Sequence, residues 1–171
     1  AMLLPNSGRE RLVCLDVSSG KLLWQLALSS PLLSNPVAID GQLFIVASST
    51  DSRQQTQMFR LLELEPETGS VQHDVALSDF RQKKSSVPFI QIAVAGSNLL
   101  LAFEGGLACC DTTGELLWVR HTAWVPPTLR AGTQQHERQP PLVTEHSIYL
   151  ATPGMSGIEC LDVDSGRRRW H

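Results

Sequence analysis

A hairpin motif occurs four times along this chain, and its repetition limits the folds that the chain can adopt. It reads LVCLDVSSGKLLW at residues 12–24, LLELEPETGSVQH at 61–73, LACCDTTGELLW at 107–118 and IECLDVDSGRRRW at 158–170. The turn glycines Gly20, Gly69, Gly114 and Gly166 are 49, 45 and 52 residues apart. A supersecondary unit that returns at such a spacing predicts a propeller, a solenoid or another repeat array.

Composition narrows the class of protein further. A chain of 171 residues can form one domain with a real core. Its net charge of −3 provides no basic field for nucleic acid, so we expect no nucleic-acid partner. No stretch reaches the roughly 18 apolar residues of a membrane helix, and no secretory signal is visible.

The segments between the motifs predict further antiparallel strands. Asp40-Gly41 separates two apolar runs, which is a strong hairpin signal. Similar pairs of strands flank residues 96–98 and 144–146. Each pair precedes a motif that is itself a hairpin, in which the acidic and hydroxyl residues close the turn and glycine takes positive φ. We therefore expect units of four antiparallel strands, A-B-C-D, and negligible helix.

Counting these units predicts an all-β propeller segment of about three and a half four-stranded antiparallel blades. Residues 1–28 form a partial blade, and residues 34–77, 87–122 and 140–171 form whole ones, all within a single segment. Blades expose sheet faces that neighbours must cover. We therefore expect either a piece of a longer protein or two associated copies, with self-association through the incomplete edges.

The units resemble the PQQ-like repeat of β-propellers, the repeat of the quinoprotein alcohol dehydrogenase-like superfamily. Leu15, Asp16, Gly20, Leu23 and Trp24 carry the resemblance in the first unit, and matching positions recur in the third and fourth. The resemblance implies that the motif tryptophans pack between adjacent blades, near the turn glycine of a neighbour. The implied inter-blade docking residues are Trp24, Trp118, Trp170, Gly20, Gly69, Gly114 and Gly166.

Two units depart from this pattern. The second has Glu65 in place of the aspartate and His73 in place of the tryptophan, so we expect a weaker contact there. The third has a turn that is one residue shorter, from Asp111 to Gly114.

The order of strands predicts where ligands would bind. In an A-B-C-D meander, the B–C and D–A loops share one face of the disk, and here they hold every long insertion, at 48–57, 78–86 and 121–140. Binding residues concentrate on loops that a rigid scaffold holds, so we expect any binding on this long-loop face. A solvated, variable rim remains the alternative.

The 121–140 segment contains the candidate binding residues. Trp124 stands outside the repeat motif, with Arg130, His136 and Arg138 in the same segment. An exposed aromatic with arginines is a common composition of interaction hot spots. The alternative is that Trp124 covers the end of its own blade.

The sequence contains no recognisable catalytic or metal site. The five histidines and four cysteines lack zinc-ligand spacing, and nucleophile-elbow and phosphate-loop motifs are missing. Cys109-Cys110 lies within a predicted strand, where successive side chains point to opposite faces, so we expect two packed thiols. The sequence shows no acidic cluster of the kind that holds Ca²⁺ with six to eight oxygen ligands.

Three hypotheses follow for function. The first is a non-catalytic propeller module that binds a protein or small ligand without a cofactor. The second is part of a quinoprotein dehydrogenase dependent on PQQ and calcium, and the third is a purely architectural repeat of a large surface protein. The family resemblance favours an extracytoplasmic location, either periplasmic or at the cell surface.

Overall fold

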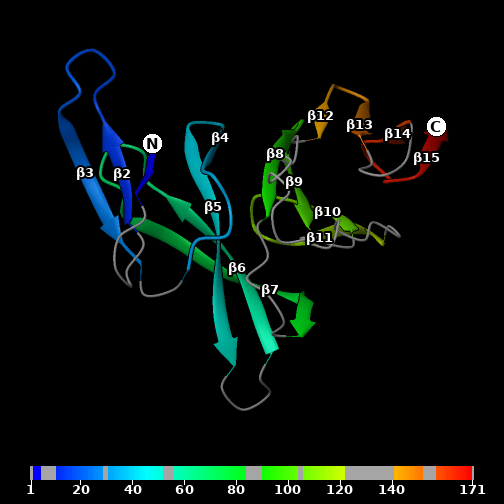
Figure 1. Cartoon of the computed structure of the whole chain (residues 1–171), viewed down its shortest axis with the longest axis horizontal. Helices are drawn as coiled ribbons and strands as arrows, with labels where there is room; N and C mark the ends of the chain where they lie inside the picture. Colours follow the sequence, from blue (N-terminus) through cyan, green and yellow to red (C-terminus); the bar gives the residue numbers. More distant parts are fainter. Residues whose placement is uncertain are drawn as a thin grey trace, which may run out of the picture. The chain divides into compact units, whose positions relative to one another are not determined.

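The computed structural model is built entirely from antiparallel β-sheets in its described part (Figure 1). It describes residues 2–4, 11–28, 31–51, 56–83, 90–103, 106–121, 141–151 and 157–170. The chain divides into two compact units, residues 1–87 and residues 88–171. Each unit holds two sheets, and each sheet is a meander of sequence-adjacent strands.

The first unit contains a three-stranded sheet and a four-stranded one. The three-stranded sheet consists of β1 (Met2–Leu4), β2 (Arg11–Leu15) and β3 (Leu22–Ala27). The four-stranded sheet consists of β4 (Val37–Ile39), β5 (Gln42–Asp51), β6 (Thr56–Leu64) and β7 (Val71–Lys83).

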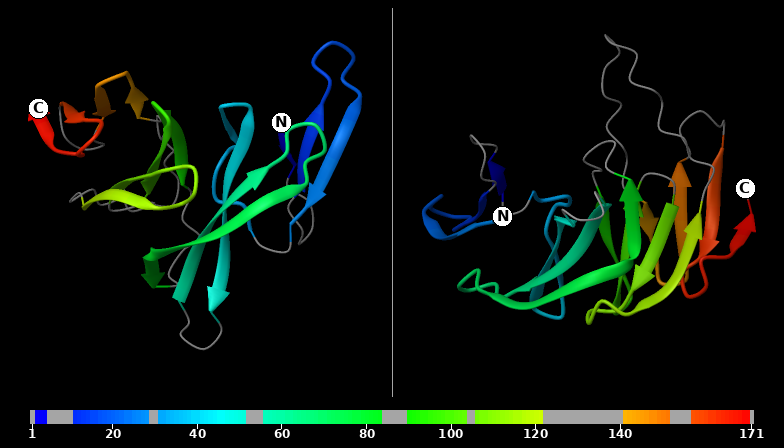
Figure 2. Two further views of the ribbon diagram at one scale, coloured as in Figure 1. Left: turned by 180° about the vertical axis from the view of Figure 1, so that it is seen from behind. Right: turned by 90° about the horizontal axis from the view of Figure 1, so that it is seen from below.

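The second unit contains two four-stranded sheets, which Figure 2 shows from two further directions. One consists of β8 (Gln91–Ala95), β9 (Asn98–Phe103), β10 (Gly106–Cys110) and β11 (Leu116–His121). The other consists of β12 (Leu142–Val143), β13 (Ser147–Ala151), β14 (Ile158–Asp162) and β15 (Arg168–Trp170). One three-stranded and three four-stranded sheets confirm the predicted segment of about three and a half blades.

Turn chemistry explains why the strands meet where they do. Asp40 and Gly41, with φ of 48° and 81°, both adopt the left-handed conformation that joins β4 to β5 in a tight hairpin. Gly96 does the same between β8 and β9 with a φ of 64°. Because these residues tolerate positive φ, the hairpin registers can be read from the sequence.

The second sheet corrects one expectation of the sequence analysis. The sequence predicts a loop over residues 48–57, but β5 and β6 remain paired as far as Asp51 and Thr56. β7 likewise continues to Lys83, and a bulge shifts its register, because Met58 pairs with Arg81 while Phe59 pairs with Leu77. Hydrogen bonds between strands join backbone groups and do not require apolar side chains, so a paired segment can be polar and resemble a loop in sequence.

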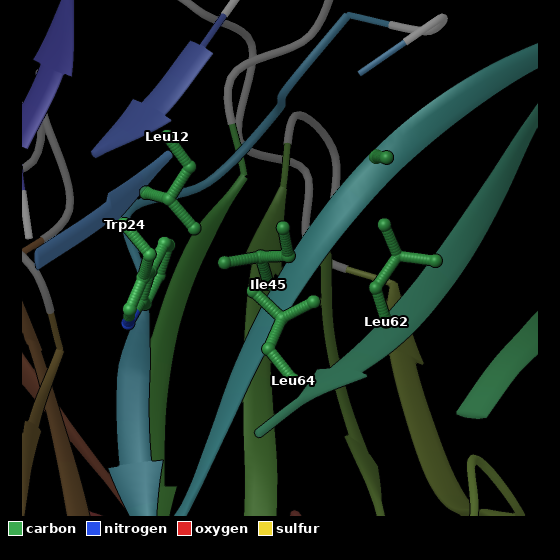
Figure 3. Packing of buried hydrophobic residues seen from close by; sticks show 6 residues of the cluster. Leu12, Trp24, Ile45, Leu62 and Leu64 are labelled. Carbon is green, nitrogen blue, oxygen red and sulfur yellow. The ribbon is translucent and has the colours of Figure 1, made fainter. Parts of the chain in front are cut away.

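The core of each unit lies between its two sheets. In the first unit, Leu12 and Trp24 pack with Ile45, Leu62 and Leu64 (Figure 3). In the second unit the corresponding cluster is Ala95, Leu100, Leu107, Ile148, Leu161 and Val163, with Trp118 packed against it. In each unit, the two sheets therefore pack through apolar side chains on their facing surfaces, together with a motif tryptophan.

Candidate functional site: the joints between successive sheets

Each repeat motif forms a hairpin whose acidic residue closes the turn. Asp16 Oδ1 accepts hydrogen bonds from the Ser18 hydroxyl at 2.7 Å and from the Ser19 N–H and hydroxyl at 2.7 and 2.6 Å. The Gly20 N–H donates to the Asp16 carbonyl at 2.8 Å, and Gly20 has a φ of 68°. The motif therefore closes its turn with a short carboxylate side chain, hydroxyl residues that bond to it, and a glycine at positive φ.

The fourth turn has the same construction and one additional partner. Asp162 Oδ1 accepts from the Ser165 N–H and hydroxyl, while Oδ2 accepts from Arg169 Nη2 at 2.6 Å. The bond from Arg169 and then those from Ser165 lower the pKa of Asp162 to about 2. Bonds from the Ser19 and Ser18 hydroxyls, and then from the Ser19 N–H, lower the pKa of Asp16 to about 2 as well.

The third turn is tighter, as its shorter sequence predicts. The Gly114 N–H donates to the Asp111 carbonyl three residues earlier, whereas the other motif glycines bond four residues back. Asp111 Oδ1 accepts from the Thr113 N–H and hydroxyl and from the Glu115 N–H. Burial acts to raise the pKa of Asp111, but these hydrogen bonds bring it below its usual value.

The same bulge occurs in all four motif hairpins. Cys14 pairs with Trp24 and Leu15 pairs with Leu22, so Leu23 is the extra residue of β3. The other three hairpins shift register at the equivalent point. The bulge places the aromatic residue directly opposite a cysteine, in the pairs Cys14–Trp24, Cys109–Trp118 and Cys160–Trp170.

The second motif changes both members of this cross-strand pair together. Glu63 lies opposite His73, and His73 Nδ1 is 2.7 Å from Glu63 Oε2. The His73 side chain is exposed, so a polar pair stands where the other motifs have an indole and a thiol. The division of the chain into two compact units falls in residues 87–88, after this motif.

Trp24 forms the joint of the first unit. Its indole lies so close to Gly69 that a Cβ on that residue would be 2.4 Å from the indole Cε3. The Trp24 Nε1–H donates to the Pro66 carbonyl at 2.7 Å. A side chain at Gly69 would occupy the space of the ring, so glycine is required here for close approach as well as for its φ of 70°.

Trp118 forms an equivalent joint in the second unit. A Cβ on Gly166 would lie 2.6 Å from the Trp118 Cε3, and the indole N–H donates to the Val163 carbonyl at 3.1 Å. Pro66 and Val163 both follow the acidic residue of the motif. The two joints therefore use the same atoms of the repeat: an indole, a turn glycine and the carbonyl after the acidic residue.

An arginine strengthens the second joint, which the sequence analysis did not foresee. Arg120 Nη2 donates to Glu159 Oε1, and Nη1 donates to the Gly166 carbonyl at 3.4 Å. These bonds connect β11 of one sheet to β14 of the next and to the turn that follows β14. Arg120 follows the tryptophan by two residues on the same face of its strand, which is the signal that could have identified it.

The remaining predicted docking residues are placed as follows. A Cβ added at Gly20 would meet no atom within 4 Å. Gly114 lies in its turn with a φ of 85°. Trp170 is 52% exposed, and its ring centroid is 6.0 Å from that of Tyr149. Trp24, at 8% exposed, is by contrast part of the core.

The four candidate binding residues of the 121–140 segment lie outside the described residues. They are Trp124, Arg130, His136 and Arg138. Their predicted role therefore stays a prediction.

The cysteines are free thiols packed in the sheets. Cys109, Cys110 and Cys160 are buried, and Cys14 is half-buried. Burial, followed by the nearby charge of Asp164, raises the pKa of Cys109 to about 11. Burial also raises that of Cys110 to about 12, so neither thiol ionises near neutral pH.

The described residues lack two features that would indicate a metal centre or a membrane span. They contain no group of three or more histidine, cysteine, aspartate or glutamate side chains arranged to hold a metal ion. They also contain no helix long and apolar enough to cross a membrane.

Comparison with known proteins identifies the repeat. The family model PQQ_2, described as outer membrane protein assembly factor BamB, matches residues 2–171. No curated protein matches the chain.

Among solved structures, BamB from Moraxella catarrhalis is similar with a TM-score of 0.56 at 15% sequence identity. The match covers 99% of this chain and 46% of that one, so the chain spans less than half the length of that BamB. The likeness shows a shared fold of PQQ-like propeller sheets. Since the family model covers nearly every residue, the chain belongs to the PQQ_2 family, described as outer membrane protein assembly factor BamB.

Proposed function

We propose that this chain is a non-catalytic segment of a BamB-like propeller, which acts as a rigid scaffold for protein partners. The observation that carries this proposal is the match of residues 2–171 to a family described as an outer membrane protein assembly factor. The proposed role is to hold partner proteins during the assembly of outer membrane proteins. That role places the chain outside the cytoplasm.

The chemistry of the repeat supports a scaffold. The polar groups of the motif bond within their own turns, as Asp16 does with Ser18 and Ser19. The indoles of Trp24 and Trp118 are held between sheets. These side chains are committed to structure, which is what a repeat protein needs in order to present loops in fixed positions.

Within each unit, we assign partner binding to the end of each sheet from which the B–C and D–A connections leave. The paired extension of β5, β6 and β7 lies at this end of its sheet. The 121–140 segment, with Trp124, Arg130, His136 and Arg138, connects β11 to β12 at the corresponding end. Tryptophan and arginine are the residue types that most often dominate protein interfaces.

Site-specific photo-crosslinking in cells tests this proposal. A photoreactive residue replacing Trp124 in the full gene product should crosslink to a protein of the outer-membrane assembly machinery. The same residue at Leu23, an exposed bulge position in a motif hairpin, is the matched control and should not. Equal crosslinking at both positions, or none at Trp124, would contradict the assignment of the surface.

A second measurement separates the scaffold from the other functions. Partner capture should fall when Trp124→Ala and Arg130→Ala are combined, whereas unchanged capture would favour a purely architectural repeat. Dye-linked alcohol oxidation after incubation of the full protein with PQQ and Ca²⁺ would instead establish a quinoprotein dehydrogenase and overturn the non-catalytic role.

A further inference from the structure

β7 is an edge strand whose outer side has no partner strand in the described part of the chain. It is the last strand of the order β4-β5-β6-β7, and every backbone pair that it forms is with β6. With 13 residues it is also the longest described strand. Sheets precede and follow it along the chain, so its edge position does not come from either end of the sequence.

Two bulges bound a regular segment of this edge, His73–Leu77. One bulge lies at Gln72, and the other follows Leu77, because the ladder with β6 resumes only at Arg81. Between them the pairing is continuous. In such a segment, alternate residues direct both their N–H and C=O groups away from the ladder, where a further strand can pair with them.

The titratable side chains of this segment are held against the sheet. His73 Nδ1 lies 2.7 Å from Glu63 Oε2, and Arg60 Nε donates to Asp74 Oδ1 at 2.7 Å. His73 and Asp74 are successive residues, so the two pairs lie on opposite faces, and both use a residue of β6. Natural edge strands are commonly protected from pairing by outward charges or by proline. His73–Leu77 contains no proline, and β6 engages its charged groups.

The corresponding edges of β3 and β11 differ, because an indole occupies the place of His73. Trp24 donates to the Pro66 carbonyl, and Trp118 donates to the Val163 carbonyl, each in the next motif hairpin. The His73 side chain is instead 73% exposed. Among these three edges, β7 is therefore the one whose first regular residue keeps its side chain in solvent.

We propose that this edge binds an extended segment of a partner protein as a fifth strand of the sheet, by β-strand addition. The two faces of the edge specify the side chains of the added strand. Val75 and Leu77 lie on one face and are half-buried and buried, whereas Asp74 and Ala76 lie on the other and are exposed. Apolar residues at alternate positions of the added strand pack beside Val75, and polar residues lie beside Asp74. Because the charges of this edge are already paired, the segment that fits best is uncharged.

The length of the site favours a peptide segment over a second copy of this chain. The regular segment spans only residues 73–77, whereas a stable protein–protein interface uses roughly 20–30 residues on each side. A short edge suits an extended segment, whose affinity comes from main-chain hydrogen bonds and whose specificity comes from alternate side chains.

Peptide binding to the whole chain tests the proposal. The probe is a short capped peptide in which valine alternates with glutamine. It should bind and should protect backbone amides of His73–Leu77 from hydrogen exchange. The same peptide with N-methyl groups at alternate residues is the control, and it should bind more than about tenfold more weakly, because several hydrogen bonds are lost together.

Two matched variants locate the binding. Ala76 lies opposite Arg60 at the β7 edge, and Ala27 lies opposite Arg11 at the β3 edge, and both alanines are exposed. Ala76→Glu should weaken peptide binding by about tenfold, because it places a new charge beside the added strand. Ala27→Glu should leave binding unchanged. Thermal unfolding checks that both variants remain folded.

Three results would overturn the proposal: no gain of protection in His73–Leu77, equal binding of the N-methylated peptide, or equal weakening by Ala27→Glu and Ala76→Glu. Self-association of the chain that Ala76→Glu abolishes would assign the edge to a second copy instead. Crosslinking from Trp124 concerns the ends of the sheets, so failure at the β7 edge leaves the proposed scaffold function standing.

Discussion

Trp24 lies across Gly69 so closely that the glycine has no room for a side chain. A Cβ on Gly69 would come within 2.4 Å of one indole carbon and 2.6 Å of another. The same relation holds between Trp118 and Gly166 in the second unit. The glycine of the repeat thus serves two purposes, turning its own hairpin and receiving the indole of the preceding one.

Substitution of this glycine should separate the two purposes. Gly69→Ala is expected to destabilise the chain by about 2–5 kcal/mol, because it combines a left-handed backbone cost of about 1–2 kcal/mol with overpacking of about 1–3 kcal/mol. Gly20→Ala has nearly the same φ but open space, so it should carry only the backbone cost. Urea unfolding of both variants measures the difference, and equal losses would contradict the packing role of Gly69.

The buried and exposed tryptophans should respond differently to the same change. Trp24→Ala is expected to cost about 3–5 kcal/mol, because the indole is buried between two sheets. Trp24→Phe keeps a ring but leaves the Pro66 carbonyl without its donor, at a cost of about 1 kcal/mol or more. Trp170→Phe should have little effect on a dilute sample, and a comparable loss there would contradict the distinction.

Acid should weaken the motif turns of Asp16 and Asp162. Their pKa values are lowered from 3.8 to about 2 in the folded chain, so the unfolded chain binds protons more readily as the pH falls. The contribution of these carboxylates is fully present above about pH 4 and is lost as the pH approaches 2. Thermal unfolding between pH 2 and 5 should show a shallower pH dependence for Asp16→Asn and Asp162→Asn than for the wild type.

The ion pair between Arg120 and Glu159 should couple the two sheets of the second unit. Both side chains are largely buried, at 27% and 16% exposed, and they belong to β11 and β14. A double-mutant cycle with Arg120→Met and Glu159→Gln is expected to give a coupling energy of about 1 kcal/mol. The exposed pair Arg60–Asp74 is a suitable comparison and should give less. A coupling near zero at Arg120 would show that its packing alone matters.

Thiol reactivity should report the packing of the motif strands. Cys14 is half-buried, so a disulfide reagent such as DTNB should modify it first in the native chain. Cys109 and Cys110 are buried with pKa values raised to about 11 and 12, so they should react only on unfolding, as should buried Cys160. Cys14→Ser should remove the fast phase, and rapid labelling of Cys110 would contradict its burial.

Several features of this fold could be predicted from the sequence because they depend on neighbouring residues. Asp40-Gly41 and the motif turns are fixed by short polar side chains and by glycine at positive φ, which act over a few residues. The recurrence of the motif then predicted repeated sheets. The shortened third turn is also visible in the sequence, because one residue fewer must give a tighter ring between Asp111 and Gly114.

Other features depend on contacts between distant strands and could not be predicted in this way. The polar segment at 48–57 resembles a loop in sequence, yet its first four residues, Ser48–Asp51, pair with residues 56–59 of β6, because hydrogen bonds between strands do not require apolar side chains. The bond between Arg120 and Glu159 joins residues 39 positions apart, so the place of Arg120 beside the tryptophan indicates its strand face but not its partner.

Local residues alone specify a series of repeated antiparallel hairpins, since the turns and the alternation of apolar residues are local properties of the chain. Which indole lies against which glycine depends instead on how the sheets pack against one another. Identical motifs acquire different environments according to their neighbours: Trp24 and Trp118 each have an adjacent sheet to pack against, whereas Trp170 and Gly20 remain open. That difference arises from packing between sheets, which depends on the position of a repeat in the folded chain rather than on its residues.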